Sequence, residues 1–248
     1  TGSGKTLSFL FPSFHHIITN RLDAGDPAVL ILAPTRELAC QIEKEANKFG
    51  ESASIATACA YGGAPRGIQV AALKKGVHLL IGTPGRLNDF LDGGDLKLSR
   101  ASKLVIDEAD RMLDLGFEPQ IRKILKELPS PRHTLFFTAT WPASVQKLAS
   151  DFLCKPYKVE VGNPDVLKAS PNVTQQVKIV DPDRKVRELT KVFLQFEISE
   201  KGRGENRALI FCSTKKMCEQ LEDGLNRARV NCDSIHGDKD QQQREKAL

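Results

Sequence analysis

Short apolar runs alternate with longer amphipathic stretches along most of this 248-residue chain. The runs are rich in β-branched residues and contain few charges, as expected of strands buried on both faces of a sheet; they span residues 29–32, 79–81, 104–106, 135–137, 159–161, 177–180 and 209–211. Helical patterns fall between them, at residues 7–18, 36–49, 118–128, 143–153, 184–196 and 215–228. This alternation predicts an α/β fold in which right-handed crossovers build a parallel sheet with helices on both faces.

Turn-forming residues gather between positions 162 and 172, where glycine, proline, asparagine and serine are frequent. We therefore predict a first domain over residues 1–165, a linker over 166–172 and a second domain over 173–248. Few strand signals follow the linker before the chain stops inside a helical pattern. The second domain is thus expected to be incomplete.

The composition narrows the class of protein further. With 40% hydrophobic and 27% charged residues, the chain fits a globular protein that buries a sizeable core. It has no apolar stretch near the roughly 18 residues that span a bilayer, and no secretory signal pattern. The six cysteines form no C-x-x-C pair, which indicates free intracellular thiols. The net charge of +5 permits an anionic partner but does not by itself indicate a nucleic acid.

The chain opens on a glycine-rich turn that matches the second part of the phosphate-loop pattern G-x-x-x-x-G-K-[ST]; its residues are Thr1, Gly2, Ser3, Gly4, Lys5 and Thr6. Glycines let backbone N–H groups approach phosphate oxygens, and the helix that follows directs its positive N-terminus at the same anion. Lys5 is expected to neutralise the terminal phosphates, and the Thr6 hydroxyl to hold Mg²⁺. An ordinary turn before a helix is the alternative, because Gly-Lys-Thr arises by chance in about one such chain in ten.

Acidic residues follow the predicted strand at 104–106. Asp107 and Glu108 stand where a buried strand ends, which is the edge of a parallel sheet where ligands bind. Asp107 could meet the ion held by Thr6, either directly or through water, and Glu108 could orient or deprotonate an attacking water. The alternative is structural, because acidic residues also favour the first turn of a helix.

These motifs, taken together, resemble the DEAD-box family of ATP-dependent RNA helicases, whose name spells residues 107–110 of this chain. Further matches occur in the family's order at residues 34–39 (motif Ia), 62–63 (GG), 83–86 (motif Ib), 138–140 (motif III), 209–214 (motif IV) and 241–244 (Q-x-x-R). The resemblance covers practically the whole chain. It implies a RecA-like parallel sheet followed by a second, incomplete RecA-like domain, with ATP and RNA bound by the pair.

The resemblance also implies a set of functional residues. Residues 1–6 would bind ATP, Thr6 and Asp107 would hold Mg²⁺, and Glu108, Asp107 and Lys5 would be catalytic. Motif III would couple hydrolysis to strand separation through Thr138 and Thr140 acting with Asp110; Thr138 stands where the family usually has serine. The RNA-binding residues would be Pro34, Thr35, Arg36, Gly62, Gly63, Thr83, Pro84, Gly85, Arg86, Gln241 and Arg244.

The turns at 34–36 and 83–86 make chemical sense as RNA sites. Each follows a predicted strand and offers backbone N–H groups, a hydroxyl and an arginine, which suit phosphates and sugars more than base edges. Binding is then expected to be independent of RNA sequence. Aromatic residues make up only 6% of the chain, so no stacking platform is evident. Solvated arginines at helix starts and a plain glycine turn are the alternatives.

Some family motifs do not occur in this chain. The Q motif, which reads adenine, is absent, as are motifs V and VI, whose arginines complete the ATP site. Because the chain also starts at Thr1 inside the phosphate loop, we expect a fragment that does not hydrolyse ATP well by itself. Two rival functions stay open: an RNA clamp that does not unwind, and a DNA-directed translocase. Ribonucleoprotein components are expected partners, no membrane association is expected, and the compartment, nucleus or cytoplasm, is undecided.

Overall fold

The computed structural model describes residues 4–161, 173–196, 207–239 and 241–247. The chain divides into two compact units, Thr1–Leu167 and Lys168–Leu248. Thr1, Gly2, Ser3 and the predicted linker at 166–172 lie outside the described residues.

The first unit is built on a five-stranded parallel sheet with the order β2-β3-β1-β4-β5. The strands are β1 (Val29–Leu32), β2 (Thr57–Ala60), β3 (Leu79–Gly82), β4 (Lys103–Ile106) and β5 (His133–Phe136). In the centre of the sheet, Ile31 of β1 lies opposite Ile81 of β3 and Val105 of β4. The predicted parallel α/β sheet is confirmed.

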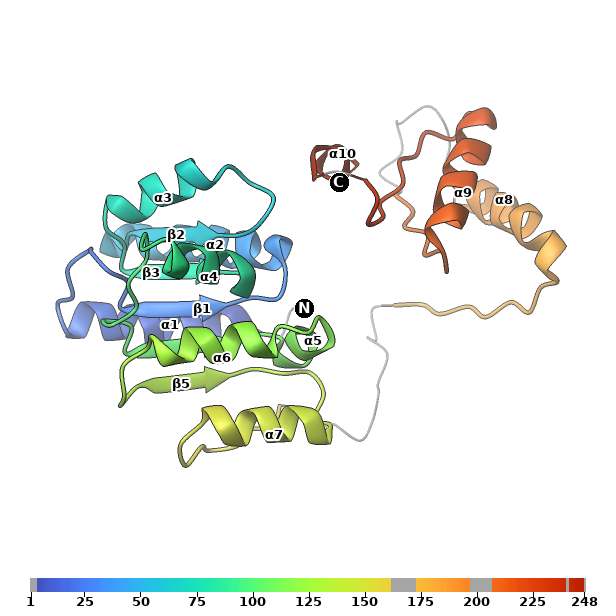
Figure 1. Cartoon of the computed structure of the whole chain (residues 1–248). Helices are drawn as coiled ribbons and strands as arrows, with labels where there is room; N and C mark the ends of the chain where they lie inside the picture. The colour runs from blue at the N-terminus through green and yellow to red at the C-terminus, as the bar shows by residue number, and fades with distance from the viewer. Residues whose placement is uncertain (1–3, 162–172, 197–206, 240, 248) are drawn as a thin grey trace. The chain divides into compact units, whose positions relative to one another are not determined.

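Helices cover both faces of this sheet (Figure 1). Along β1, Val29 and Ile31 pack with the core of α1 (Lys5–Thr19) and α2 (Arg36–Gly50). Leu30 and Leu32 point the other way and pack with α3 (Arg66–Lys74), α4 (Pro84–Asp92), α5 (Ala109–Asp114), α6 (Glu118–Lys126) and α7 (Ala143–Phe152). Because alternate residues of a strand point to opposite faces, such a strand must be apolar throughout.

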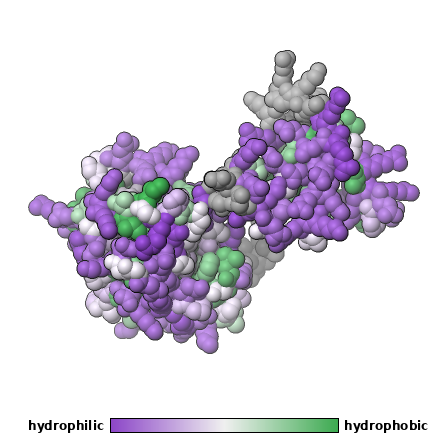
Figure 2. All heavy atoms as spheres, turned by 45° about the horizontal axis from the view of Figure 1, so that its top comes forward, coloured by the Kyte–Doolittle hydropathy of each residue, from purple (hydrophilic) through white to green (hydrophobic). Residues whose placement is uncertain are grey.

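The second unit contains α8 (Lys185–Gln195), α9 (Lys215–Arg227) and α10 (Gln241–Lys246). Short 3₁₀ turns occur in each unit, η1 (Glu51–Ala53) in the first and η2 (Pro182–Arg184) in the second. The helices predicted from periodicity all form, with ends within two residues of the expected ones. Hydrophilic side chains prevail on the face shown in Figure 2, and hydrophobic ones form small separate areas.

One strand was missed by the sequence analysis, and three predicted strands do not form. β2 was not predicted, because Thr57, two alanines and one cysteine carry little β-branched character. Conversely, residues 159–161, 177–180 and 209–211 form no strand in the structure. Their side chains are largely exposed, including Val159, Val177 and Phe211. An extended segment becomes a strand when a neighbour pairs with its backbone, and composition does not supply that neighbour.

Helix caps show how the local sequence defines these elements. Thr35 precedes α2, and its Oγ1 accepts a hydrogen bond from the Leu38 N–H at 3.3 Å. Pro84 occupies the first turn of α4, where its missing N–H costs nothing. Within the described residues, no helix is both long enough and apolar enough to cross a membrane.

Candidate functional site

The predicted site residues of the first unit lie at the carboxyl ends of its parallel strands. Pro34 follows β1, Gly62 follows β2, Thr83 follows β3, Asp107 follows β4 and Thr138 follows β5. Parallel strands all end at the same edge of a sheet, so the fold gathers turns that are far apart in sequence.

The helix α1 begins at this edge from a glycine in the left-handed region. Gly4 is the N-cap, with φ 73°, and a Cβ on it would meet nothing within 4 Å. This backbone conformation suits glycine, and the open space leaves room for an anion beside the helix N-terminus. The helix runs for 15 residues, with Lys5 and Thr6 in its first turn.

Lys5 and Asp107 form an ion pair at the start of α1. Lys5 Nζ lies 2.8 Å from Asp107 Oδ1, which also accepts a hydrogen bond from the Glu108 N–H at 2.9 Å. The Asp107 residue is fully buried. Burial raises the pKa of the Asp107 carboxyl, and the hydrogen bond and charge of Lys5 oppose that shift.

The second oxygen of the same carboxylate is unsatisfied. Asp107 Oδ2 is buried and has no hydrogen-bond partner in the described structure. A buried acceptor without a donor is costly, and a hydrated cation would satisfy it. No group of three or more His, Cys, Asp or Glu side chains in the described ranges could hold a metal. A single carboxylate instead fits Mg²⁺, which retains several waters and uses substrate phosphates as ligands.

Glu108 is the N-cap of the short helix α5 and has a strained backbone conformation. Its φ of 51° and ψ of 52° fall in the left-handed region, which a non-glycine residue seldom adopts. The side chain is 30% exposed, and its Oε2 lies 3.3 Å from Arg111 Nη1. The two neighbouring carboxylates have different partners, since Asp107 pairs with Lys5 and Glu108 with Arg111.

Asp110 connects the turn after β4 with the turn after β5. Its Oδ2 accepts hydrogen bonds from the Thr140 N–H at 3.0 Å and from the Thr140 hydroxyl at 2.8 Å. The Thr138 hydroxyl donates to the Thr140 carbonyl at 2.9 Å, which stabilises the turn. Burial would raise the pKa of Asp110, but the hydrogen bonds from Thr140 and the Arg111 backbone outweigh it, so the pKa is lowered.

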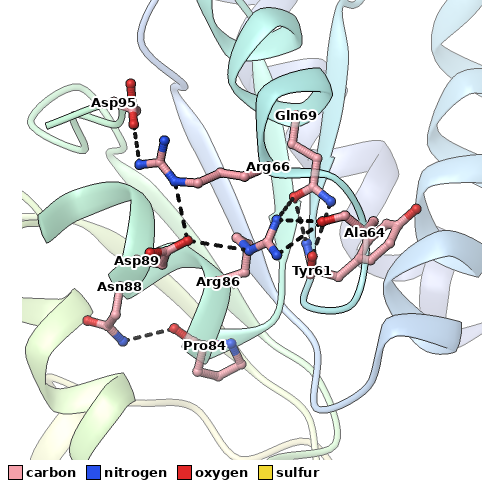
Figure 3. Close-up of polar contacts among 9 residues, drawn as sticks. All are labelled: Tyr61, Ala64, Arg66, Gln69, Pro84, Arg86, Asn88, Asp89 and Asp95. Carbon is pink, nitrogen blue, oxygen red and sulfur yellow. Dashed lines mark hydrogen bonds and ion pairs between the residues drawn. The ribbon is translucent and has the colours of Figure 1, made fainter. Parts of the chain in front are cut away.

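Neither arginine of the predicted RNA turns is a simple solvated cation. Arg36 stacks over the Tyr61 ring, with Cζ 4.7 Å from the ring centroid. The Arg86 side chain is 13% exposed, and its Nη1 and Nη2 donate to the Ala64 carbonyl at 3.2 Å (Figure 3). The turns after β1, β2 and β3 are therefore linked by side chains.

The remaining predicted RNA residues divide between the two units. Gly62, Gly63 and Gly85 are exposed, Thr83 is half-buried, and Pro34 and Pro84 are buried. Gln241 and Arg244 lie on α10 of the second unit.

The sequence analysis did not identify two residues that link these turns. Gln69 on α3 and Tyr61 after β2 exchange two hydrogen bonds, and Gln69 also accepts one from Arg86. A glutamine inside an amphipathic helix carries no local signal of such a role. Its burial at 8% exposure is a tertiary property.

A glycine turn at a helix N-terminus that faces a buried carboxylate at a parallel strand end is the arrangement of P-loop nucleotide-binding proteins. Residues 1–148 match the family model of the DEAD/DEAH box helicase, and residues 184–248 match that of the helicase conserved C-terminal domain. The chain therefore belongs to the DEAD/DEAH box helicase family. The predicted family and the RecA-like fold class are confirmed.

Curated relatives match along the whole chain. It is 49% identical to DEAD-box ATP-dependent RNA helicase 14 of Arabidopsis thaliana, covering 100% of this chain and 39% of that protein. It is 50% identical to DEAD-box ATP-dependent RNA helicase 40 of Oryza sativa subsp. japonica, covering 100% and 31%. For ATP-dependent RNA helicase DBP2 of Candida glabrata the identity is 48%, covering 100% and 45%. The chain thus spans less than half the length of each of these relatives.

Proposed function

We propose that the natural protein that contains this chain is an ATP-dependent RNA helicase, which couples ATP binding and hydrolysis to RNA binding and to local duplex unwinding or ribonucleoprotein remodelling. The observation that carries this proposal is the meeting of Lys5 and Asp107 at 2.8 Å, with Asp107 Oδ2 left unsatisfied. The names of the relatives support the same activity.

In this proposal the start of α1 binds the phosphates of the substrate ATP. Thr1, Gly2, Ser3 and Gly4 would supply backbone N–H groups, and Lys5 would supply the positive charge. Thr6 and Asp107 would hold Mg²⁺, because a hydroxyl and an unsatisfied carboxylate oxygen are its preferred kind of ligand. When bound, the ion supplies charge neutralisation for the phosphates.

Glu108 is the proposed general base. It follows Asp107 directly, it is partly exposed, and its contact with Arg111 is a surface ion pair that is easily exchanged. A carboxylate in this position can orient a water and accept its proton. Asp110 and Thr140 would pass changes at the ATP site to the turn after β5, because their two hydrogen bonds join the two turns directly.

RNA would bind along the turns after β1, β2 and β3. The turns after β2 and β3 expose glycine backbone, and Arg36 and Arg86 are turned toward the protein. Backbone N–H groups and hydroxyls recognise phosphates and sugars without reading bases, so binding would be independent of sequence. Gln241 and Arg244 of the second domain, residues 173–248, would contribute further contacts. Six free cysteines support an intracellular location, in the nucleus or the cytoplasm.

The test uses the natural full-length protein with ATP and a short RNA duplex. We expect ATP hydrolysis that RNA stimulates and DNA does not, together with ATP-dependent release of one strand. RNA-stimulated hydrolysis without strand release would instead identify an RNA clamp. Stimulation by DNA would identify a DNA translocase, and a protein that binds neither ATP nor RNA would contradict the proposal.

A further inference from the structure

The arginine of motif Ib is surrounded by protein acceptors. Arg86 Nη1 donates to the Ala64 carbonyl and to Gln69 Oε1, both at 3.2 Å, and Nη2 donates to the same carbonyl at 3.2 Å. Its Nε lies 3.6 Å from Asp89 Oδ2. With the side chain 13% exposed, this guanidinium could not turn to a phosphate without losing these partners.

Gln69 binds the same turn at Tyr61. Its Oε1 accepts from the Tyr61 N–H at 3.2 Å, and its Nε2 donates to the Tyr61 carbonyl at 3.1 Å. One side-chain amide therefore satisfies both backbone groups of Tyr61, as a neighbouring strand would. The reason lies in the sheet order, because β2 is an edge strand and β3 flanks it on one side only.

Two carboxylates, Asp89 on α4 and Asp95 after it, form ion pairs with the arginines shown in Figure 3. Asp89 Oδ2 lies 3.6 Å from Arg86 and 3.5 Å from Arg66 Nε, and Arg66 also pairs with Asp95. Asp89 is 51% exposed, so these ion pairs orient Arg86 more than they stabilise the fold.

We propose that Gln69 and Arg86 are positioning residues, which together clamp the turn at residues 61–64 to the N-terminus of α4. The inference rests on the proposed function, since the clamped turns are those proposed to bind RNA. Above the clamp, a Cβ at Gly62 or Gly85 would meet nothing within 4 Å, so the backbone of both turns is open to a ligand. The clamp holds these two stretches of backbone at one spacing, and preorganisation of this kind strengthens binding.

The test measures RNA affinity of the natural full-length protein with a fluorescent single-stranded poly-uridine oligonucleotide and a non-hydrolysable ATP analogue, over a series of salt concentrations. We expect Gln69→Ala to weaken RNA binding about tenfold, because it leaves buried donors and acceptors of the turn unsatisfied. Arg86→Lys should weaken it similarly, because an ammonium keeps the charge but cannot hold both oxygens in a fork.

Three further results separate positioning from a direct contact. The salt dependence of RNA binding should be unchanged in both variants, because no phosphate contact is lost. The double variant should bind no more weakly than the worse single variant, because both break one network. Hydrogen exchange at Gly62 and Gly63 should become faster in Gln69→Ala without RNA. Gln41→Ala, a change at an exposed glutamine of α2, serves as the matched control and should behave as wild type.

Two results would contradict the proposed clamp. If Arg86→Lys keeps wild-type affinity and Gln69→Ala has no effect, Arg86 is a direct phosphate ligand and the clamp is wrong. If Gln69→Ala does not fold, Gln69→Glu decides the matter. It retains the acceptor for Arg86, loses the donor to Tyr61 and should weaken binding about threefold; unchanged binding would overturn the clamp. A wild-type protein that binds no RNA would overturn the proposed function itself.

Discussion

Two regions at the same edge of the sheet are prepared for ligands in opposite ways. At the start of α1, Lys5 and Asp107 face each other, and one carboxylate oxygen is buried without a partner. At the turns after β2 and β3, Arg86 and Gln69 satisfy one another and the backbone, and exposed glycines face outward. The first region contains charged side chains and a carboxylate oxygen that only a ligand would satisfy. In the second region the polar side chains already have protein partners, and the exposed backbone is what a ligand would contact. This difference suits a triphosphate with a metal ion in one place and an extended polyanion in the other.

The largest effect is expected from Glu108→Gln in the charged region. The amide retains the shape of the side chain but accepts no proton, so the rate of ATP hydrolysis should fall by about 10²–10⁴-fold. Binding of ATP and RNA should persist. Single-turnover hydrolysis beside a binding assay measures both quantities, with Glu127→Gln at the exposed C-cap of α6 as the control. Unchanged hydrolysis would remove Glu108 from the role of base.

Lys5→Ala should act on nucleotide binding. Loss of a charge-assisted contact to phosphate is expected to weaken ATP binding by about 10- to 100-fold, as measured by titration with a fluorescent analogue. RNA binding in the absence of nucleotide should change little, because the second region contains no contact to Lys5. Lys97→Ala, at an exposed lysine, provides the comparison. Equal losses of ATP and RNA affinity would mean that the two regions are not separate.

The same substitution should make stability depend on pH. Without Lys5 the buried carboxylate of Asp107 has no counter-charge, which should cost about 1–2 kcal/mol at pH 8, less than for a fully buried pair because Lys5 is 35% exposed. Burial already raises the pKa of Asp107, and loss of Lys5 raises it further. The cost should therefore shrink as the pH falls through that pKa, because the protonated acid needs no partner. Denaturant unfolding at several pH values measures this, and a pH-independent cost would contradict it.

The smallest effect is expected at the backbone of the second region. Gly63 has φ 80°, so Gly63→Ala should destabilise the turn by about 1 kcal/mol and weaken RNA binding about fivefold. Gly67→Ala on α3 is the matched control, since its Cβ would meet nothing within 4 Å and φ there is not positive. Thermal unfolding and RNA titration of both variants make the comparison. A Gly63→Ala protein with wild-type RNA affinity would show that this turn does not contact RNA.

Prediction from sequence succeeded where the signal is local. The strand β1 is apolar throughout because both of its faces are covered, and helices such as α2 are marked by a threonine cap. Prediction failed where a strand forms only because a neighbouring strand pairs with its backbone. β2 forms from a weak sequence beside β3, whereas Val177 and Ile179 remain exposed, and the segment around them forms no strand. Strand formation depends on a neighbouring strand, so composition alone gave the wrong prediction for both segments.

The candidate site follows the same division. The residue types of the phosphate loop, the carboxylates of residues 107–110 and the glycine turns are visible in the sequence, because each motif is a short run of residues with its own chemistry. Only the tertiary structure decided that Lys5 neutralises Asp107, that one oxygen of Asp107 is left unsatisfied, and that Arg86 turns inward to Gln69. These outcomes depend on burial and on which turns the parallel sheet brings to one edge, and no short stretch of sequence contains that information.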